Sequence, residues 1–139
     1  MPLSSSNLTV GTSHSAEVVE NLTRTQIIQY AGASGDYNPL HTDEIFAVQV
    51  AGYPSVFAHG MLTMGMTGRM LTDYVGDDRL IRYGGRFTSQ VWPGDTLTAT
   101  ATVTSIGEED GVPVAEFDVI TRNQDDVAVF TGTAAARID

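Results

Sequence analysis

The segment of residues 60–75, with the sequence GMLTMGMTGRMLTDYV, decides the fold that we predict for this chain. Apolar and small residues surround most of its axis, and a helix that is apolar on most faces is buried inside a protein. Four stretches with the pattern of strands follow it, separated by turn signals. These stretches span residues 80–91, 97–106, 112–122 and 127–138. A buried helix followed by closely spaced strands predicts an α+β fold in which an antiparallel sheet wraps around the helix.

Shorter elements precede this helix. Residues 14–19 have the pattern of a strand. Thr23 and Gln26, three residues apart, form a capping box that predicts the start of a helix, which ends near Gly32. A further short helix is predicted for residues 42–50.

The composition predicts a single soluble domain in the cytoplasm. A length of 139 residues suits one core, so residues 1–139 form one domain, with residues 1–7 loosely held. The sequence lacks an apolar stretch that could span a bilayer, and its first residues lack the basic and apolar regions of a secretory signal. The absence of cysteine excludes disulfides, thiolate catalysis and cysteine-based zinc sites.

Residues 34–41, SGDYNPLH, contain a carboxylate and an imidazole five positions apart. Gly35 and Pro39 disfavour regular helix here and predict a rigid, bent loop. Such a loop can hold Asp36 and His41 together for general acid and base catalysis, since imidazole titrates near neutral pH. A purely structural interpretation is also open, in which Asp36 caps backbone groups and His41 is an ordinary loop histidine.

Two motifs carry a family resemblance. Residues 30–41, YAGASGDYNPLH, together with residues 58–62, AHGML, resemble the hydratase motif of MaoC-like enzymes, also called hydratase 2. The resemblance extends from about Leu22 to Ile138. It implies the hot-dog fold and the interconversion of trans-2-enoyl and (3R)-hydroxyacyl thioesters of CoA or acyl carrier protein, without a cofactor. It also implies a homodimer, or a heterodimer with a related hot-dog subunit, whose active site lies near the interface.

The resemblance also implies roles for individual residues. His41 and Asp36 correspond to the catalytic dyad, and we assign His41 to the C2 proton and Asp36 to the hydroxyl at C3. Gly60 is expected to stabilise the thioester oxyanion through its N–H, because unpaired amides and the helix dipole face outward at a helix start. Alternatively, Gly60 is needed only for the backbone conformation of the turn in which it lies. Some family members have a hydroxyl side chain further along this helix, and Thr67 could take its place here.

Three neighbouring residues have both a functional and a structural interpretation. Asn38 is a candidate substrate contact, although we prefer a role in holding the loop through its side-chain amide. His59 is more simply a residue with one structural hydrogen bond than a second catalytic histidine. Met64, with other methionines of the helix, either fills the core or borders an acyl tunnel.

The formal net charge of −10 makes nucleic acid a poor partner. Four of the seven basic residues nevertheless lie in one short segment, namely Arg69, Arg79, Arg82 and Arg86. Because guanidinium groups suit phosphate, Arg79 and Arg82 are candidates to bind the phosphate of CoA or phosphopantetheine. The alternative is that these arginines are solvated or pair with nearby aspartates.

We predict no metal site. A calcium loop that starts at Asp36 would need glycine at position 41 and glutamate at position 47, which are histidine and alanine here. The zinc motif H-E-x-x-H is also missing from the sequence. Two other functions stay open beside the hydratase, namely thioester hydrolysis and a non-catalytic acyl-binding subunit of a heteromeric dehydratase.

Overall fold

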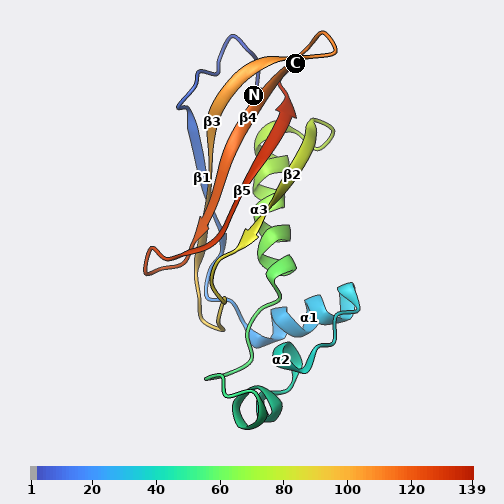
Figure 1. Ribbon diagram of the computed structural model, residues 1–139, viewed down its shortest axis with the longest axis vertical. Coiled ribbons are helices and arrows are strands. Elements are labelled where there is room, and N and C mark those ends of the chain that lie inside the picture. The colour runs from blue at the N-terminus through green and yellow to red at the C-terminus, as the bar shows by residue number, and fades with distance from the viewer. Residues whose placement is uncertain (1–2) are drawn as a thin grey trace.

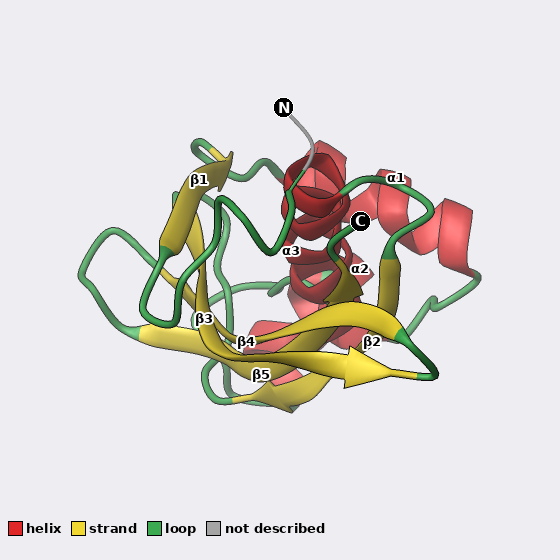
Figure 2. Cartoon of the chain, turned by 90° about the horizontal axis from the view of Figure 1, so that it is seen from above, coloured by secondary structure: helices red, strands yellow, loops and turns green. Residues whose placement is uncertain are grey.

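The computed structural model describes residues 3–139 and contains a five-stranded antiparallel sheet that curves around one long helix (Figures 1 and 2). The spatial order is β1-β3-β4-β5-β2. The elements are β1 (Ser13–Val19), β2 (Leu80–Phe87), β3 (Leu97–Glu109), β4 (Val112–Arg122), β5 (Ala128–Arg137) and the helix α3 (Gly60–Val75). The α+β fold predicted from the sequence, an antiparallel sheet wrapped around a helix, is therefore confirmed.

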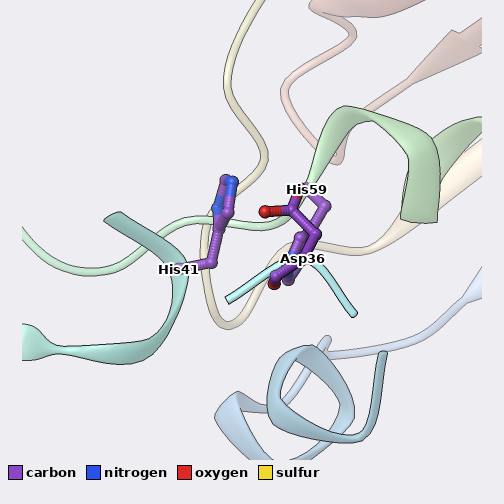
Figure 3. A group of neighbouring side chains, drawn as sticks. All are labelled: Asp36, His41 and His59. Carbon is purple, nitrogen blue, oxygen red and sulfur yellow. The ribbon is translucent and has the colours of Figure 1, made fainter. Parts of the chain in front are cut away.

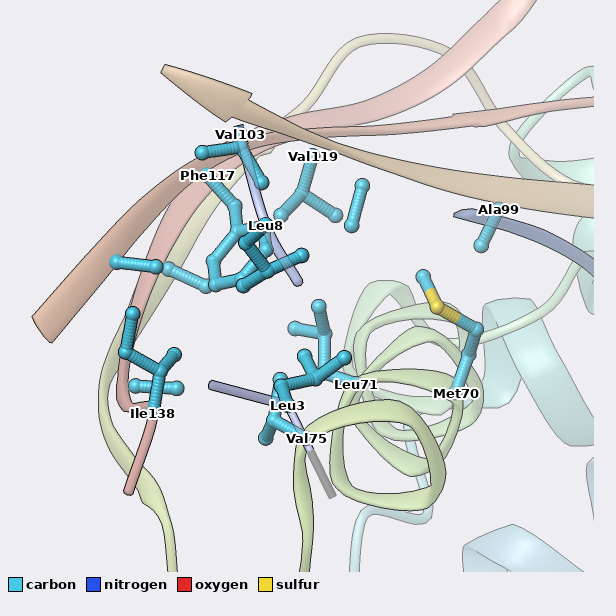
Figure 4. Close-up of a cluster of buried hydrophobic side chains, with 14 of the residues drawn as sticks. Leu3, Leu8, Met70, Leu71, Val75, Ala99, Val103, Phe117, Val119 and Ile138 are labelled. Carbon is cyan, nitrogen blue, oxygen red and sulfur yellow. The ribbon is translucent and has the colours of Figure 1, made fainter. Parts of the chain in front are cut away.

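Alternating side chains of the strands form the core between the sheet and α3. In β3, Leu97, Ala99 and Ala101 are fully buried, whereas the intervening Thr98 is exposed. This alternation follows from the two-residue period of a strand, which directs successive side chains to opposite faces. Figure 4 shows how these inward side chains meet the helix; the cluster includes Met70, Leu71, Val75, Val103, Phe117, Val119 and Ile138.

Helix α3 has the predicted bounds, and one stripe along it is exposed. Its buried residues are Thr63, Thr67, Met70, Leu71 and Val75. Met61 is 55% exposed, and Gly65, Arg69 and Asp73, at intervals of four residues, are exposed with it. The predicted burial is thus confirmed for the side of the helix that the sheet covers, while one stripe is left uncovered.

Two strand ends differ from the prediction. β2 ends at Phe87 instead of residue 91, because the chain leaves the sheet there and the Val91 carbonyl accepts a hydrogen bond from the Ala58 N–H at 2.8 Å. β3 continues beyond residue 106 to Glu109, since Asp110 and Gly111 both take positive φ and make a tight hairpin with β4.

Two helices, α1 (Arg24–Ser34) and the one-turn α2 (Pro39–Thr42), lie at one end of the sheet (Figure 1). The predicted capping box is confirmed, with the Gln26 N–H 3.0 Å from the Thr23 hydroxyl. α1 runs two residues past Gly32 and ends where Gly35 takes a left-handed conformation with φ of 76°.

Two residues of the described N-terminus contact the core. Leu3 and Leu8 are buried in the main core, and the Ser4 N–H donates to Asn7 Oδ1 at 2.8 Å. Residues 5–7 are exposed, so the looseness of this segment stays a prediction, and residues 1–2 lie outside the described residues. Within residues 3–139, the helices are too short or too polar to cross a membrane.

Candidate active site

The loop that carries Asp36 and His41 is partly helical. Its last three residues, with Thr42, form α2, in which Pro39 occupies the first position and Asn38 is the N-cap. Asn38 Oδ1 accepts a hydrogen bond from the Leu40 N–H at 3.0 Å, which confirms that Asn38 holds the loop. The prediction of a non-helical loop is wrong for α2, because proline at the first helical position loses no hydrogen bond and has a suitable φ.

The predicted helix over residues 42–50 begins later than expected. Asp43 ends α2 in an extended conformation, and its carboxylate accepts the Phe46 N–H at 3.2 Å. The last five residues, Phe46–Val50, form a π-helix labelled η1. This segment buries Ala47 and leads the chain back toward the start of α3.

Three side chains meet between α1 and the start of α3. A carboxylate oxygen of Asp36, a ring nitrogen of His41 and a ring nitrogen of His59 all lie within 4.8 Å of one another (Figure 3). The structure thus brings Asp36 and His41 together, as the sequence predicts. We call these two residues the candidate dyad.

His41 is half-buried and has one ring nitrogen committed. Its Nδ1 lies 2.6 Å from the Phe57 carbonyl oxygen, which can only accept, so Nδ1 carries a proton and Nε2 is left for chemistry. Burial lowers the pKa of His41 below 6.5, and nearby His59 lowers it further, whereas the Phe57 carbonyl and the Asp36 carboxylate act in the opposite direction. The neutral imidazole is therefore favoured near pH 7, which suits a general base.

His59 is buried and supports both members of the candidate dyad. Its Nε2 lies 2.9 Å from the Asp36 carbonyl oxygen, which confirms the predicted structural hydrogen bond. Its ring also stacks on the His41 ring, with centroids 3.9 Å apart. The sequence analysis missed this stacking, for which the only signal was the position of His59 directly before Gly60.

A cavity of about 280 Å³ lies beside the candidate dyad. Its wall includes Gly60, Thr63, Phe57 and Phe87. Asp36 and His41 are not part of this wall, but Phe57 joins the two places, since its ring packs edge-on against His41 with centroids 5.1 Å apart. The start of α3 therefore has a hollow next to the two titratable side chains.

Gly60 is the first residue of α3, and no side chain caps this helix start. Its N–H is therefore one of the amides that a helix leaves without an internal partner. A Cβ at position 60 would lie 2.7 Å from the Phe87 ring, so the ring can approach only a glycine here. This close approach gives Gly60 a packing role in addition to its place at the cavity.

Two residues of α3 that the sequence analysis placed at the site lie elsewhere. Thr67 is fully buried, and its Oγ1 is 2.6 Å from Thr121 Oγ1, so its hydroxyl is bonded within the core. Met64 packs against the main core and its carbonyl accepts a hydrogen bond from the Tyr83 hydroxyl at 2.7 Å. Neither lines the cavity beside the dyad, because the turn of the helix directs both toward the sheet.

Arg79 and Arg82 lie at the far end of α3 from Gly60. A helix of 16 residues is about 24 Å long. Arg82 donates to both carboxylate oxygens of Glu109, at 3.0 and 2.8 Å, and Arg79 donates to the Leu3 carbonyl at 3.1 Å. Within one chain, both guanidinium groups are thus paired and remote from the dyad. This agrees with the alternative interpretation that the arginines are paired, although their partners are Glu109 and the Leu3 carbonyl instead of nearby aspartates.

The three clustered side chains also make up a possible set of metal ligands, which sequence motifs did not reveal. Histidines that share an ion direct in-plane lone pairs at it. His41 and His59 instead lie face to face, with an angle of 27° between their planes. Their arrangement therefore suits proton transfer near one carboxylate better than coordination.

The chain is similar to proteins of a known family. The model of the MaoC-like domain family matches residues 5–131. The chain belongs to the MaoC-like family. Among curated MaoC-like relatives, the (R)-specific enoyl-CoA hydratase of Rhodospirillum rubrum is 35% identical over 97 residues, which cover 68% of this chain and 67% of the relative.

Other MaoC-like relatives match over a shorter part. The 3-hydroxyacyl-thioester dehydratase Y of Mycobacterium tuberculosis is 44% identical over 68 residues, or 47% of this chain and 23% of that protein. The chain spans less than a quarter of the length of the first curated relatives that it matches. Among solved structures, the (R)-hydratase from A. caviae superposes with a TM-score of 0.82 at 25% identity, covering 96% of this chain and 98% of that one. These neighbours confirm the hot-dog fold.

Proposed function

We propose that this MaoC-like protein hydrates trans-2-enoyl thioesters and dehydrates (3R)-3-hydroxyacyl thioesters in fatty acid metabolism. The observation that carries the proposal is the meeting of Asp36 and His41 beside Gly60 at the open start of α3. The names of relatives in the family, which are hydratases and dehydratases of acyl thioesters, support the same reaction class.

In the dehydration direction, the neutral His41 takes the acidic proton from C2 through its free Nε2. The charge that develops on the thioester oxygen is stabilised by the Gly60 N–H at the positive end of the helix dipole. Asp36 takes the C2 proton from His41 and gives it to the C3 oxygen as the C3–O bond breaks, so that water leaves. Both residues then have the protonation states with which they started. Hydration follows the same steps in reverse.

We also propose that the active form is a dimer, either of two copies or with a related hot-dog subunit. β2 is an edge strand of the sheet and exposes Ile81 and Phe87. Pairing of two such edges would cover backbone groups that otherwise invite aggregation. Light scattering during size-exclusion chromatography measures the oligomeric state, and a monomer that is fully active would contradict this proposal.

Crotonyl-CoA tests the reaction. Hydration removes the absorbance of the conjugated enoyl group without releasing a thiol, whereas hydrolysis releases CoA thiol. We expect the first result, and thiol release at the same rate would support a thioesterase instead. A panel of short and long enoyl groups on CoA and on acyl carrier protein then identifies the carrier and chain length. Protein that is inert on the whole panel, alone and with a partner subunit, would support a non-catalytic role.

A further inference from the structure

Thr63 is a buried residue of α3 whose hydroxyl makes no hydrogen bond. Its side chain is 2% exposed. Among residues 3–139, two buried side-chain polar atoms are without a hydrogen-bond partner, and these are Thr63 Oγ1 and His59 Nδ1. Buried polar groups in folded proteins are nearly always paired, because leaving one unpaired is costly. The unpaired hydroxyl therefore indicates a partner that the chain itself does not supply.

The position of Thr63 indicates where that partner lies. Thr63 follows Gly60 by three residues, so both occupy one side of the first turn of α3. Both line the same cavity of about 280 Å³. Threonine in a helix divides between two χ1 rotamers, so the hydroxyl can turn toward a group in the cavity. Because the hydroxyl is unpaired, this rotation breaks no existing hydrogen bond.

The neighbouring threonine hydroxyls and Gly68 cannot take this role. The Thr67 hydroxyl is bonded to Thr121 at 2.6 Å, and the Thr88 hydroxyl, also at the cavity, donates to the Ala128 carbonyl at 2.8 Å. Gly68 has no side chain, and a Cβ there would already be 3.1 Å from the Tyr83 ring. Thr63 is thus the threonine at this end of α3 whose hydroxyl is free to bind a ligand.

We propose that the Thr63 hydroxyl donates a hydrogen bond to the thioester oxygen of the acyl substrate, beside the Gly60 N–H. This inference rests on the proposed hydratase function and deepens it. A second donor on the same oxygen stabilises the enolate-like charge more than it stabilises the neutral thioester. Thr63 transfers no proton in this role, so atoms and charges balance as in the reaction described above.

Two pairs of variants that differ by one hydroxyl test this role on crotonyl-CoA. The first pair is the wild type and Thr63→Val, which keeps the branched shape and removes the hydroxyl. The second pair has a smaller side chain, with the hydroxyl in Thr63→Ser and without it in Thr63→Ala. We expect Thr63→Val to lower kcat about 10²-fold with little change in KM, and Thr63→Ala to be slower than Thr63→Ser by a similar factor. Thr72→Val, near the other end of α3, is the control and should retain full activity.

Stability and pH profile separate a substrate contact from a structural role. The Tm of Thr63→Val should equal or exceed that of the wild type, because the substitution removes an unpaired buried hydroxyl. If Thr63→Val does not fold, the serine and alanine pair decides the question, and equal rates for these two would overturn the inference. A pH–rate profile displaced in Thr63→Val would also overturn it, since that would show an effect through His59 and His41. Wild-type protein without hydratase activity would overturn the proposed function and this inference together.

Discussion

His59 Nε2 lies 2.9 Å from the carbonyl oxygen of Asp36, so the residue before helix α3 anchors the loop that carries the candidate acid. The same imidazole stacks on His41. A single buried side chain therefore connects both members of the candidate dyad to the helix whose first residue lines the cavity. The relative positions of acid, base and helix start therefore depend on His59 as well as on the Asn38 cap and the Phe57 carbonyl.

Replacement of His59 should therefore reduce both activity and stability. His59→Ala leaves the Asp36 carbonyl without its donor and opens a hole in a fully buried place, which we expect to cost about 2–4 kcal/mol of unfolding free energy. Turnover of the folded fraction should fall about 10-fold or more because the dyad loses its geometry. Urea unfolding and crotonyl-CoA kinetics measure the two effects, and a stable variant with full turnover would contradict the anchoring role.

The dyad variants should lose activity without losing the fold. Asp36→Asn keeps the Oδ1 that accepts the Asn38 N–H at 3.2 Å, and Asp36 is exposed, so its thermal stability should stay close to that of the wild type. We expect Asp36→Asn and His41→Ala each to lower kcat/KM by about 10²- to 10⁴-fold. Asp110→Asn, in the exposed turn after β3, is the matched control. A large loss of Tm in Asp36→Asn would instead favour the structural interpretation of this loop.

Activity and stability should both depend on the protonation of His41. Burial lowers the pKa of His41 below 6.5 in the folded chain, so the acid limb of the kcat/KM profile should lie below pH 6.5. In the unfolded chain His41 titrates near its ordinary value, and the unfolded state thus binds more protons between the two pKa values. The unfolding free energy should therefore fall as pH decreases from about 6.5 through the lowered pKa.

Urea unfolding across this pH range checks the sign, with His41→Ala as the reference that lacks the group. A contribution of His41 that grows toward acid pH would show that its pKa is raised in the folded chain. That result would contradict burial as the main influence on this imidazole.

Gly60 and Phe87 should show coupled effects. Gly60→Ala places a Cβ within 2.7 Å of the Phe87 ring, which is about half exposed and can move only by disturbing the cavity wall. We expect a loss of about 1–3 kcal/mol in stability and at least a 10-fold loss in kcat. Adding Phe87→Ala should recover much of the stability, as a double-mutant cycle measures. Additive effects would show that the two residues do not compete for this space.

Arg82 should not contribute to substrate binding within one chain. Its guanidinium pairs with Glu109 and Glu116 at the end of the sheet remote from the dyad. Arg82→Gln, alone or with Arg79→Gln, should leave KM for crotonyl-CoA and for an enoyl group on acyl carrier protein unchanged. A severalfold rise in KM, with unchanged stability, would restore the prediction that these arginines bind a carrier phosphate.

Local signals in the sequence determined much of the fold. The bounds of α3 and β4 and the capping box at Thr23 agree with the structure, because glycine breaks, strand alternation and side-chain caps act between residues close in the chain. The positions of Asp36 and His41 were also evident, since five residues on a constrained turn cannot separate far. The helical turn at Pro39 was missed because proline stops a helix in its interior but suits its first position.

Only the tertiary structure decided the contacts between distant residues. His59 reaches Asp36 across 23 positions, Thr67 meets Thr121 across 54, and Arg82 finds Glu116 across 34. Such partners depend on the path of the whole chain and on which face of α3 the sheet covers. For this reason the sequence by itself determined which residues could carry acid and base chemistry, whereas the packing around α3 decided which hydroxyls, imidazoles and guanidinium groups remain available to a substrate.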